Sequence, residues 1–147
     1  MADKLEIEIT ESACNVAAET LKRAFLPYRN WGIKLALDDF GSAYANLSLF
    51  SQVQFDRIKL DCSLIAALGD NRAGQALLES IVRISNERHM QVIAEGVEQK
   101  AQEQILVQAG CQFAQGFLYD KALTPELFAT KYLQHNDNHN ITLTAQA

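Results

Sequence analysis

The sequence predicts an α/β domain built on parallel strands. Short runs of alternating or aliphatic residues are separated by longer runs whose apolar residues recur at helical spacing. The chain has 147 residues and 48% hydrophobic content, which suits one domain with its own core. No stretch reaches the roughly 18 consecutive apolar residues that a membrane span needs, so no membrane segment is expected.

Five runs are expected to form strands. The first alternates strictly between apolar and polar residues, the second alternates less strictly, and the last is short. Runs joined by helices of this length favour a parallel sheet, because a parallel pair needs a long crossover connection. The five runs cover residues 5–10, 33–38, 57–61, 91–95 and 113–119.

Helices are expected between these strands. Apolar residues from Cys14 to Phe25 recur at helical spacing between the first two runs. A second apolar set runs from Ala101 to Ala109 and should end at Gly110, since glycine commonly terminates helices. Between the third and fourth runs, an apolar stripe and an outward charged set are expected. The stripe is Leu77, Ile81 and Ile84, and the charged set is Glu79, Arg83 and Glu87.

Charge and terminal composition exclude several classes of protein. The net charge of −5 and the absence of clustered Lys and Arg argue against a nucleic-acid polymer as partner. Acidic residues near Met1 replace the basic and apolar regions of a signal peptide, so a cytoplasmic location is expected. Residues 135–147 are rich in Asn and polar, and we expect one domain at 1–134 followed by a polar tail.

A polar or charged group stands at the carboxyl end of every expected strand. In a parallel sheet these ends meet at one rim, where active sites form. Several carboxylates at one rim repel one another unless a cation neutralises them, and oxygen ligands favour Mg²⁺ or Mn²⁺ over zinc. The sequence therefore predicts a divalent metal site. The groups are Glu8 to Glu11, Asp38 and Asp39, Lys59 and Asp61, Glu95 to Glu98, and Gln115.

Five short motifs follow one another along the chain. They are Glu8-Ile9-Thr10-Glu11-Ser12, Leu37-Asp38-Asp39-Phe40-Gly41-Ser42, Phe55-Asp56-Arg57-Ile58-Lys59-Leu60-Asp61, Ala94-Glu95-Gly96-Val97-Glu98 and Gln115-Gly116-Phe117. In this order they resemble the EAL domain, the family of cyclic di-GMP phosphodiesterases. The resemblance covers residues 5–134 and implies a TIM-like (β/α) barrel. It also implies two metal ions, Mg²⁺ or Mn²⁺, and hydrolysis of one phosphodiester bond of cyclic di-GMP to give pGpG.

The resemblance also implies roles for individual residues. Glu8 and Asp38 would bind one metal ion, and Asp38 would bridge to a second ion held by Asp39 and Glu95. Lys59 would lie beside the attacking water and the phosphate. Asp39, Lys59 and Glu95 are thus the expected catalytic residues.

Three further residues are expected to support the site. Gln115 would orient the water or the substrate, and Glu98 would hold neighbouring groups in place. Glu11 would anchor the loop after Asp39; alternatively, it is an acid favoured at the start of a helix that Thr10 or Ser12 caps.

The chain lacks the Glu-Ala-Leu stretch of the family and a further asparagine ligand, so an incomplete barrel is expected. One hypothesis is the C-terminal part of a phosphodiesterase, inactive alone. A second is a degenerate module that binds cyclic di-GMP or a protein without hydrolysis, and a third is a truncated product without a role of its own. Five strands leave two open edges, which predicts self-association or pairing with a complementary N-terminal half-barrel.

Overall fold

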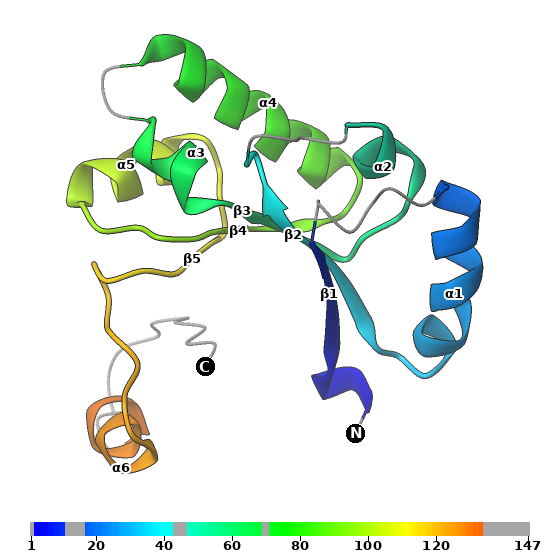
Figure 1. Ribbon diagram of the computed structural model, residues 1–147. Helices are drawn as coiled ribbons and strands as arrows, with labels where there is room; N and C mark the ends of the chain where they lie inside the picture. Colours follow the sequence, from blue (N-terminus) through cyan, green and yellow to red (C-terminus); the bar gives the residue numbers. More distant parts are fainter. Residues whose placement is uncertain (1, 11–16, 43–46, 69–70, 134–147) are drawn as a thin grey trace.

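The computed structural model describes residues 2–10, 17–42, 47–68 and 71–133 (Figure 1). Five parallel strands form one sheet whose spatial order follows the chain. The expected fold class is confirmed, and the first four strands lie close to their expected bounds. The strands are β1 (Glu6–Thr10), β2 (Lys34–Phe40), β3 (Arg57–Leu60), β4 (Gln91–Ala94) and β5 (Phe113–Ala114).

Helices follow each strand along the chain. The three longest, α1 (Ala18–Asn30), α4 (Arg72–Glu87) and α5 (Lys100–Gln108), are those that the sequence predicts. None of the described helices is long and apolar enough to cross a membrane. The remaining short elements are η1 (Ala2–Lys4), α2 (Leu47–Gln52), α3 (Cys62–Ala66), α6 (Pro125–Phe128) and the π-helix η3 (Ala129–Leu133).

Alternation along the strands gives the sheet two different faces. One face packs on the helices and carries the buried core, which includes Leu35, Leu37, Ile58, Leu60 and Val92. Residues between these positions point to the opposite face, because successive side chains of a strand alternate. We call this opposite side the polar face. Its residues include Glu6, Glu8, Ala36, Asp38, Arg57, Lys59, Gln91 and Ile93.

The fifth strand is shorter than expected. Regular pairing ends at Ala114, and the chain then turns, with the Tyr119 N–H donating to the Gly116 carbonyl. A Cβ at Gly116 would lie 2.1 Å from the carbonyl oxygen of Val97, so this segment packs directly on the loop after β4. The prediction of a strand up to Tyr119 is therefore wrong: the Gln115 N–H still donates to the Ala94 carbonyl, but the chain then turns at Gly116 and packs on the loop after β4.

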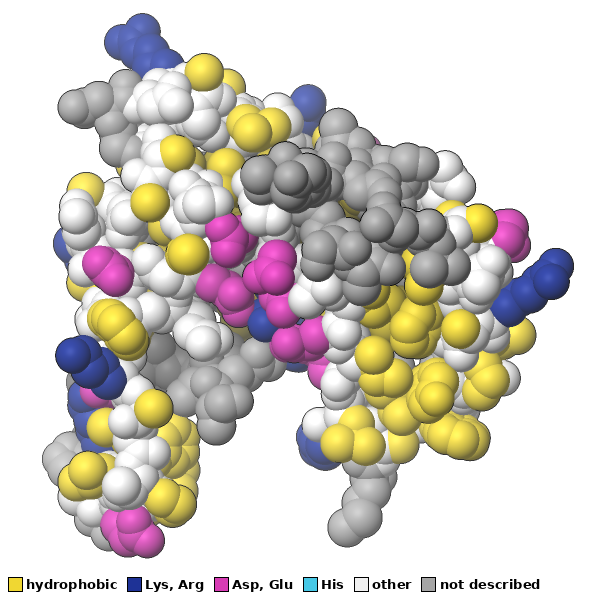
Figure 2. Space-filling model, viewed as in Figure 1, with side chains coloured by type: hydrophobic (Ala, Val, Ile, Leu, Met, Phe, Trp, Pro, Cys, Tyr) yellow, Lys and Arg dark blue, Asp and Glu magenta, His cyan; other side chains and the backbone are white. Residues whose placement is uncertain are grey.

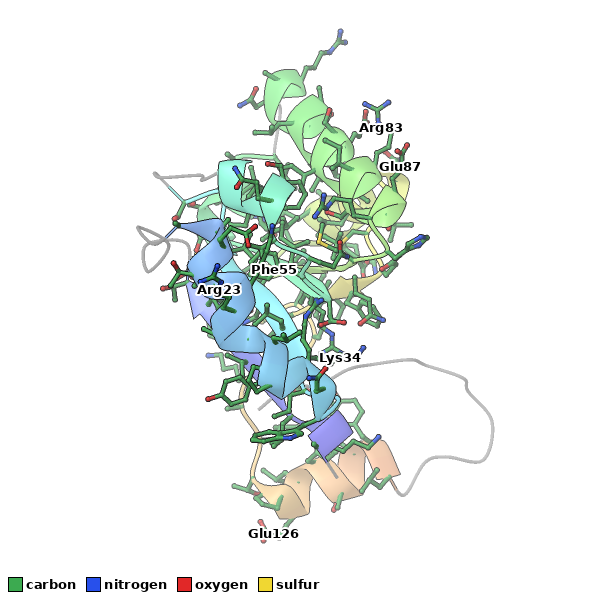
Figure 3. All side chains as sticks on the ribbon, turned by 90° about the vertical axis from the view of Figure 1, so that its right-hand side faces the viewer. Arg23, Lys34, Phe55, Arg83, Glu87 and Glu126 are labelled. Carbon is green, nitrogen blue, oxygen red and sulfur yellow. The ribbon has the colours of Figure 1, made fainter. Side chains whose placement is uncertain are left out.

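The buried face of α4 also differs from the prediction. Leu77 and Ile84 are 52% and 44% exposed. Ile81 is buried as expected, but the other two positions of the expected stripe were placed one residue off, because several adjacent apolar residues make the helical phase ambiguous. The expected outward set is confirmed, and Figure 3 shows Arg83 and Glu87 pointing away from the body. The residues that face the sheet are Leu78, Ile81, Val82 and Ser85.

Both ends of the sheet are open edges within the described part of the chain, as expected: β1 pairs with β2, and β5 pairs with β4. Helix α1, which flanks β1 and β2, has no buried residue. Figure 2 shows apolar side chains gathered over this end of the molecule. We call the large exposed residues there the edge patch, made of Leu5, Leu26, Tyr28 and Trp31.

Candidate functional site

A lysine lies among three carboxylates on the polar face. Lys59 Nζ is 3.0 Å from Glu8 Oε1, 3.1 Å from Asp38 Oδ1 and 3.0 Å from Glu95 Oε1. Figure 2 shows a basic side chain surrounded by acidic ones near the centre of the view. We call Glu8, Asp38, Lys59 and Glu95 the acid–lysine layer. The sequence predicted that these four side chains meet at one rim, and the structure brings them together.

The strands position this layer. Glu8 lies on β1, Asp38 on β2 and Lys59 on β3, while Glu95 directly follows β4, its N–H donating to the Leu60 carbonyl. The Lys59 side chain is only 10% exposed. Burial disfavours the ammonium, yet its contacts with the three carboxylates outweigh burial and raise the pKa of Lys59 above its ordinary value. Lys59 therefore stays charged.

A break in strand regularity places two adjacent aspartates at the rim. The register between β2 and β3 shifts between Leu37 and Phe40, and Asp39 has a φ of 57°. Regular alternation would send Asp38 and Asp39 to opposite faces, whereas a bulge can redirect one of them. A non-glycine residue with positive φ is a strained conformation of the kind that persists at functional sites.

Electrostatics show that the acids at this rim influence one another. Burial first, and then the charges of Asp38 and Asp61, raise the pKa of Asp39. Burial also raises the pKa of Glu95, against the hydrogen bond from Lys59. Asp61 is held elsewhere: it caps α3, its Oδ1 accepting from the Ser63 N–H at 2.9 Å. The pKa of Asp61 is lowered by the hydrogen bond from the Ser63 hydroxyl.

The oxygen donors fit a hard divalent cation. Asp38 Oδ1 is buried and has no aligned hydrogen bond, although it lies at ion-pair distance from Lys59. Carboxylate oxygens are the ligands that Mg²⁺ and Mn²⁺ prefer. Across residues 2–10, 17–42, 47–68 and 71–133, no three Asp, Glu, His or Cys residues form a ready-made metal group. The cation that the carboxylates share in this structure is the Lys59 ammonium.

The remaining predicted residues lie around the layer or outside the described chain. Gln115 is exposed, and its backbone is fixed beside β4, because its N–H donates to the Ala94 carbonyl at 2.7 Å. Glu98 is exposed just before α5, where its N–H donates to Gln102 Oε1 at 2.9 Å. Glu11 and the polar tail at 135–147 lie outside the described residues.

A second charged group lies beneath the acid–lysine layer, and the sequence analysis did not identify it. Arg57 Nη1 is 3.1 Å from Glu6 Oε2, and Arg57 Nε donates to Gln91 Oε1 at 2.9 Å. We call Glu6, Arg57 and Gln91 the floor cluster. The spacing in the sequence could have indicated this cluster. Glu6 lies two residues before Glu8, and Arg57 lies two residues before Lys59, so each shares a strand face with the residue that follows it.

A parallel sheet with alternating helices and acidic groups at its carboxyl rim is the arrangement found in barrel-type α/β domains. Comparison with known proteins identifies the family. The sequence model of the EAL domain matches residues 1–122. The chain belongs to the EAL domain family.

Similar proteins include enzymes that act on cyclic di-GMP. The chain is 30% identical over 131 residues to the cyclic di-GMP phosphodiesterase PdeR of Escherichia coli, covering 89% of this chain and 20% of PdeR. The EAL domain of Mycobacterium smegmatis DcpA has a TM-score of 0.79 and 32% identity, over 88% of this chain and 58% of that structure.

A second similar structure contains ligands. Klebsiella pneumoniae BlrP1, crystallised as a manganese and cyclic di-GMP complex, has a TM-score of 0.74 and 35% identity, over 80% of this chain and 30% of that structure. The chain thus spans less than two thirds of each of these three matches, from 20% of PdeR to 58% of the DcpA structure.

Proposed function

We propose that this chain provides the C-terminal part of a cyclic di-GMP phosphodiesterase site. The observation that carries the proposal is Lys59, held 3.0–3.1 Å from three carboxylate oxygens at the rim of the sheet. Membership of the EAL domain family and the manganese and cyclic di-GMP complex of BlrP1 support the choice of substrate and of divalent ions, Mg²⁺ or Mn²⁺.

The acidic residues would hold the ions. Glu8 and Asp38 would bind one ion, and Asp38, Asp39 and Glu95 would bind the other. Two bound ions would acidify a water molecule and stabilise the attacking and leaving oxygens of the phosphodiester. The raised pKa values of Asp39 and Glu95 fit this role, because burial first, and then the charges of neighbouring carboxylates, disfavour their charged forms, which a bound cation would stabilise.

The other site residues would act on the substrate. The Lys59 ammonium would face the phosphate and offset the negative charge that grows in the transition state. Gln115, exposed at the rim, would orient the substrate or water. Glu98 and Glu11 would position the loops on either side.

The site in this chain is incomplete by comparison with the family. The sequence holds no Glu-Ala-Leu stretch, whose glutamate is a metal ligand in the family. We therefore expect little or no hydrolysis by this chain alone. The missing ligands would come from a complementary N-terminal half-barrel that pairs with the free edge of β1. That half would also cover the edge patch, where Trp31 is 64% exposed.

Metal binding tests the residue assignments. In calorimetric titrations with Mn²⁺, Asp39→Asn should weaken binding at least tenfold, since one of the carboxylates proposed for the second ion is lost. Glu87→Gln is the matched control, because Glu87 is an exposed carboxylate on α4 and should leave binding unchanged. Equal Mn²⁺ affinity in the wild type and Asp39→Asn would remove the metal assignment.

Product analysis tests the claim that the site is incomplete. With Mn²⁺ and cyclic di-GMP, the chain alone should produce little pGpG, because binding contacts do not replace an activated water. Turnover as fast as that of an intact EAL enzyme, lost in Lys59→Ala, would show that the chain needs no added ligands.

A further inference from the structure

We propose that the floor cluster positions the acid–lysine layer, with Arg57 as the positioning residue. Glu6 and Glu8 are two residues apart on β1, and Arg57 and Lys59 are two residues apart on β3. The ion pair Arg57–Glu6 therefore joins the same two strands as the ion pair Lys59–Glu8, one step lower on the same face. A shift of β1 relative to β3 at the Arg57–Glu6 pair would therefore also move Glu8 relative to Lys59.

The two strands that these pairs join are not neighbours. Strand β2 lies between them, and Ala36 pairs with Glu8 on one side and with Arg57 on the other. Ala36 is fully buried but is not part of the helix-side core, which places its methyl group on the polar face. A small residue here lets the long side chains of β1 and β3 meet above β2.

At the level of the floor cluster the backbone ladder that links β1 to β3 through β2 is regular, but it is interrupted directly above that level. Among the described strands β1 pairs with β2 and no other, so its position relative to β3 depends on β2. Yet the pairing of β2 with β3 is irregular between Leu37 and Phe40, next to Asp38 and Asp39. Side-chain contacts just below the irregularity can align β1 with β3 where the backbone hydrogen bonds do not.

The chemistry of Arg57 suits this role of linking strands. Its guanidinium reaches Glu6 on β1 through Nη1 and Gln91 on β4 through Nε, so one rigid planar group links three strands. Glu6 Oε2 is buried and has no aligned hydrogen bond, although Arg57 lies at ion-pair distance. A buried carboxylate oxygen of this kind depends on the nearby positive charge. Loss of Arg57 would leave Glu6 without its ion-pair partner and would remove this side-chain link between β1 and β3.

Nuclear magnetic resonance on the isolated full chain tests the inference without a metal. The measurement is the scalar coupling across the hydrogen bond between Lys59 ¹⁵Nζ and Glu8 ¹³Cδ. Arg57→Met should reduce this coupling by more than half while the Lys59–Glu95 coupling persists, because β3 and β4 pair directly. Arg57→Lys, which keeps the positive charge but not the planar guanidinium, should give an intermediate coupling.

A matched control and a second variant separate positioning from general destabilisation. Lys34→Met breaks the 3.2 Å ion pair with Asp56 near the same end of the sheet and should leave the Lys59–Glu8 coupling intact. Glu6→Gln keeps the shape of the side chain but removes its charge, so it should lower the coupling even if Arg57→Met fails to fold. An unchanged coupling in Glu6→Gln and in any folded Arg57 variant would overturn the inference.

Mn²⁺ affinity gives a second readout, which rests on the proposed function. Arg57→Met should weaken Mn²⁺ binding about tenfold, the usual effect of removing a group that orients a metal ligand. If the wild type shows the coupling but binds no Mn²⁺, the proposed metal site fails, and the coupling data alone decide the positioning role. A lower melting temperature with unchanged coupling and unchanged Mn²⁺ affinity would make Arg57 structural only and contradict the inference.

Discussion

The centre of the sheet and its two ends differ in how far the chain covers its own apolar surface. Around β2, β3 and β4, the side chains of Phe55, Ile58 and Leu68 have no exposed surface. At the ends, α1 and α6 have no buried residue, and Trp31 is 64% exposed. The described part of the chain therefore completes a core at the centre of the sheet by itself, whereas the ends keep large apolar side chains exposed.

The largest effect on stability should come from the centre. Phe55 lies two residues before β3 in the sequence and is fully buried. Figure 3 labels it in the interior, next to α1. Phe55→Ala should lower the free energy of unfolding by about 4 kcal/mol, because the lost contacts leave a cavity. Urea unfolding followed by circular dichroism measures this. A loss below about 1 kcal/mol would mean that the centre is no more self-sufficient than the ends.

Lys59→Met should have the next largest effect. Removing the ammonium leaves three carboxylates facing one another, and a broken buried pair costs about 3 kcal/mol in free energy of unfolding. Added Mn²⁺ should recover part of this loss by replacing the missing positive charge. Lys22→Met, which breaks an exposed pair with Glu19, is the control and should leave stability nearly unchanged, because water screens an exposed pair. Equal losses in the two variants would contradict the layer's role.

Two glycines with positive φ, Gly96 at the rim and Gly32 after α1, differ in how closely other atoms approach them. Gly96, beside Glu95, has a φ of 69°, and a Cβ there would lie 2.4 Å from Cys62 Cβ. Gly96→Ala should therefore cost about 2 kcal/mol, from backbone strain plus the clash. Gly32 has a φ of 82° with nothing near its Cβ position, so Gly32→Ala should cost about 1 kcal/mol. Thermal melts compare the two variants, and identical shifts would show that the close approach at the rim is unimportant.

The smallest effect on stability should come from the edge patch. Trp31→Ser should change the free energy of unfolding of the chain by less than about 0.5 kcal/mol, because the ring is mostly in water. The same variant should weaken association with an N-terminal half-barrel at least tenfold, as measured by sedimentation velocity. Unchanged association would place the partner elsewhere, and a large loss of stability would show that α1 already belongs to the core.

Much of the fold was accessible from the sequence because strands with alternating residues are easy to recognise. The run at 5–10 shows a clear period of two, and the structure has β1 there. The buried face of α4 was not accessible in the same way, since Leu77 and Leu78 are both apolar and only packing decides which faces the sheet. Helices α2 and α3, of six and five residues, are too short to show a period.

The candidate site divides in a similar way. Residue types at strand ends indicated that Glu8, Asp38, Lys59 and Glu95 share one rim, since parallel strands end together. The positive φ of Asp39 and the three-way contact of Lys59 depend on the three-dimensional structure and leave no sequence pattern. The floor cluster was not predicted because its residues are the first residues of β1, β3 and β4, at the opposite end of each strand from the carboxyl rim.

Complementation tests most directly the claim that this chain is one part of a phosphodiesterase site. The chain would be mixed with the separately purified N-terminal half of a related EAL domain, in Mn²⁺ and cyclic di-GMP, and pGpG would be measured by chromatography. The proposed function predicts hydrolysis from the mixture but not from either half, and no hydrolysis when the chain carries Lys59→Ala. A stable complex of the two halves that binds cyclic di-GMP without forming pGpG would contradict it and favour a non-catalytic binding module.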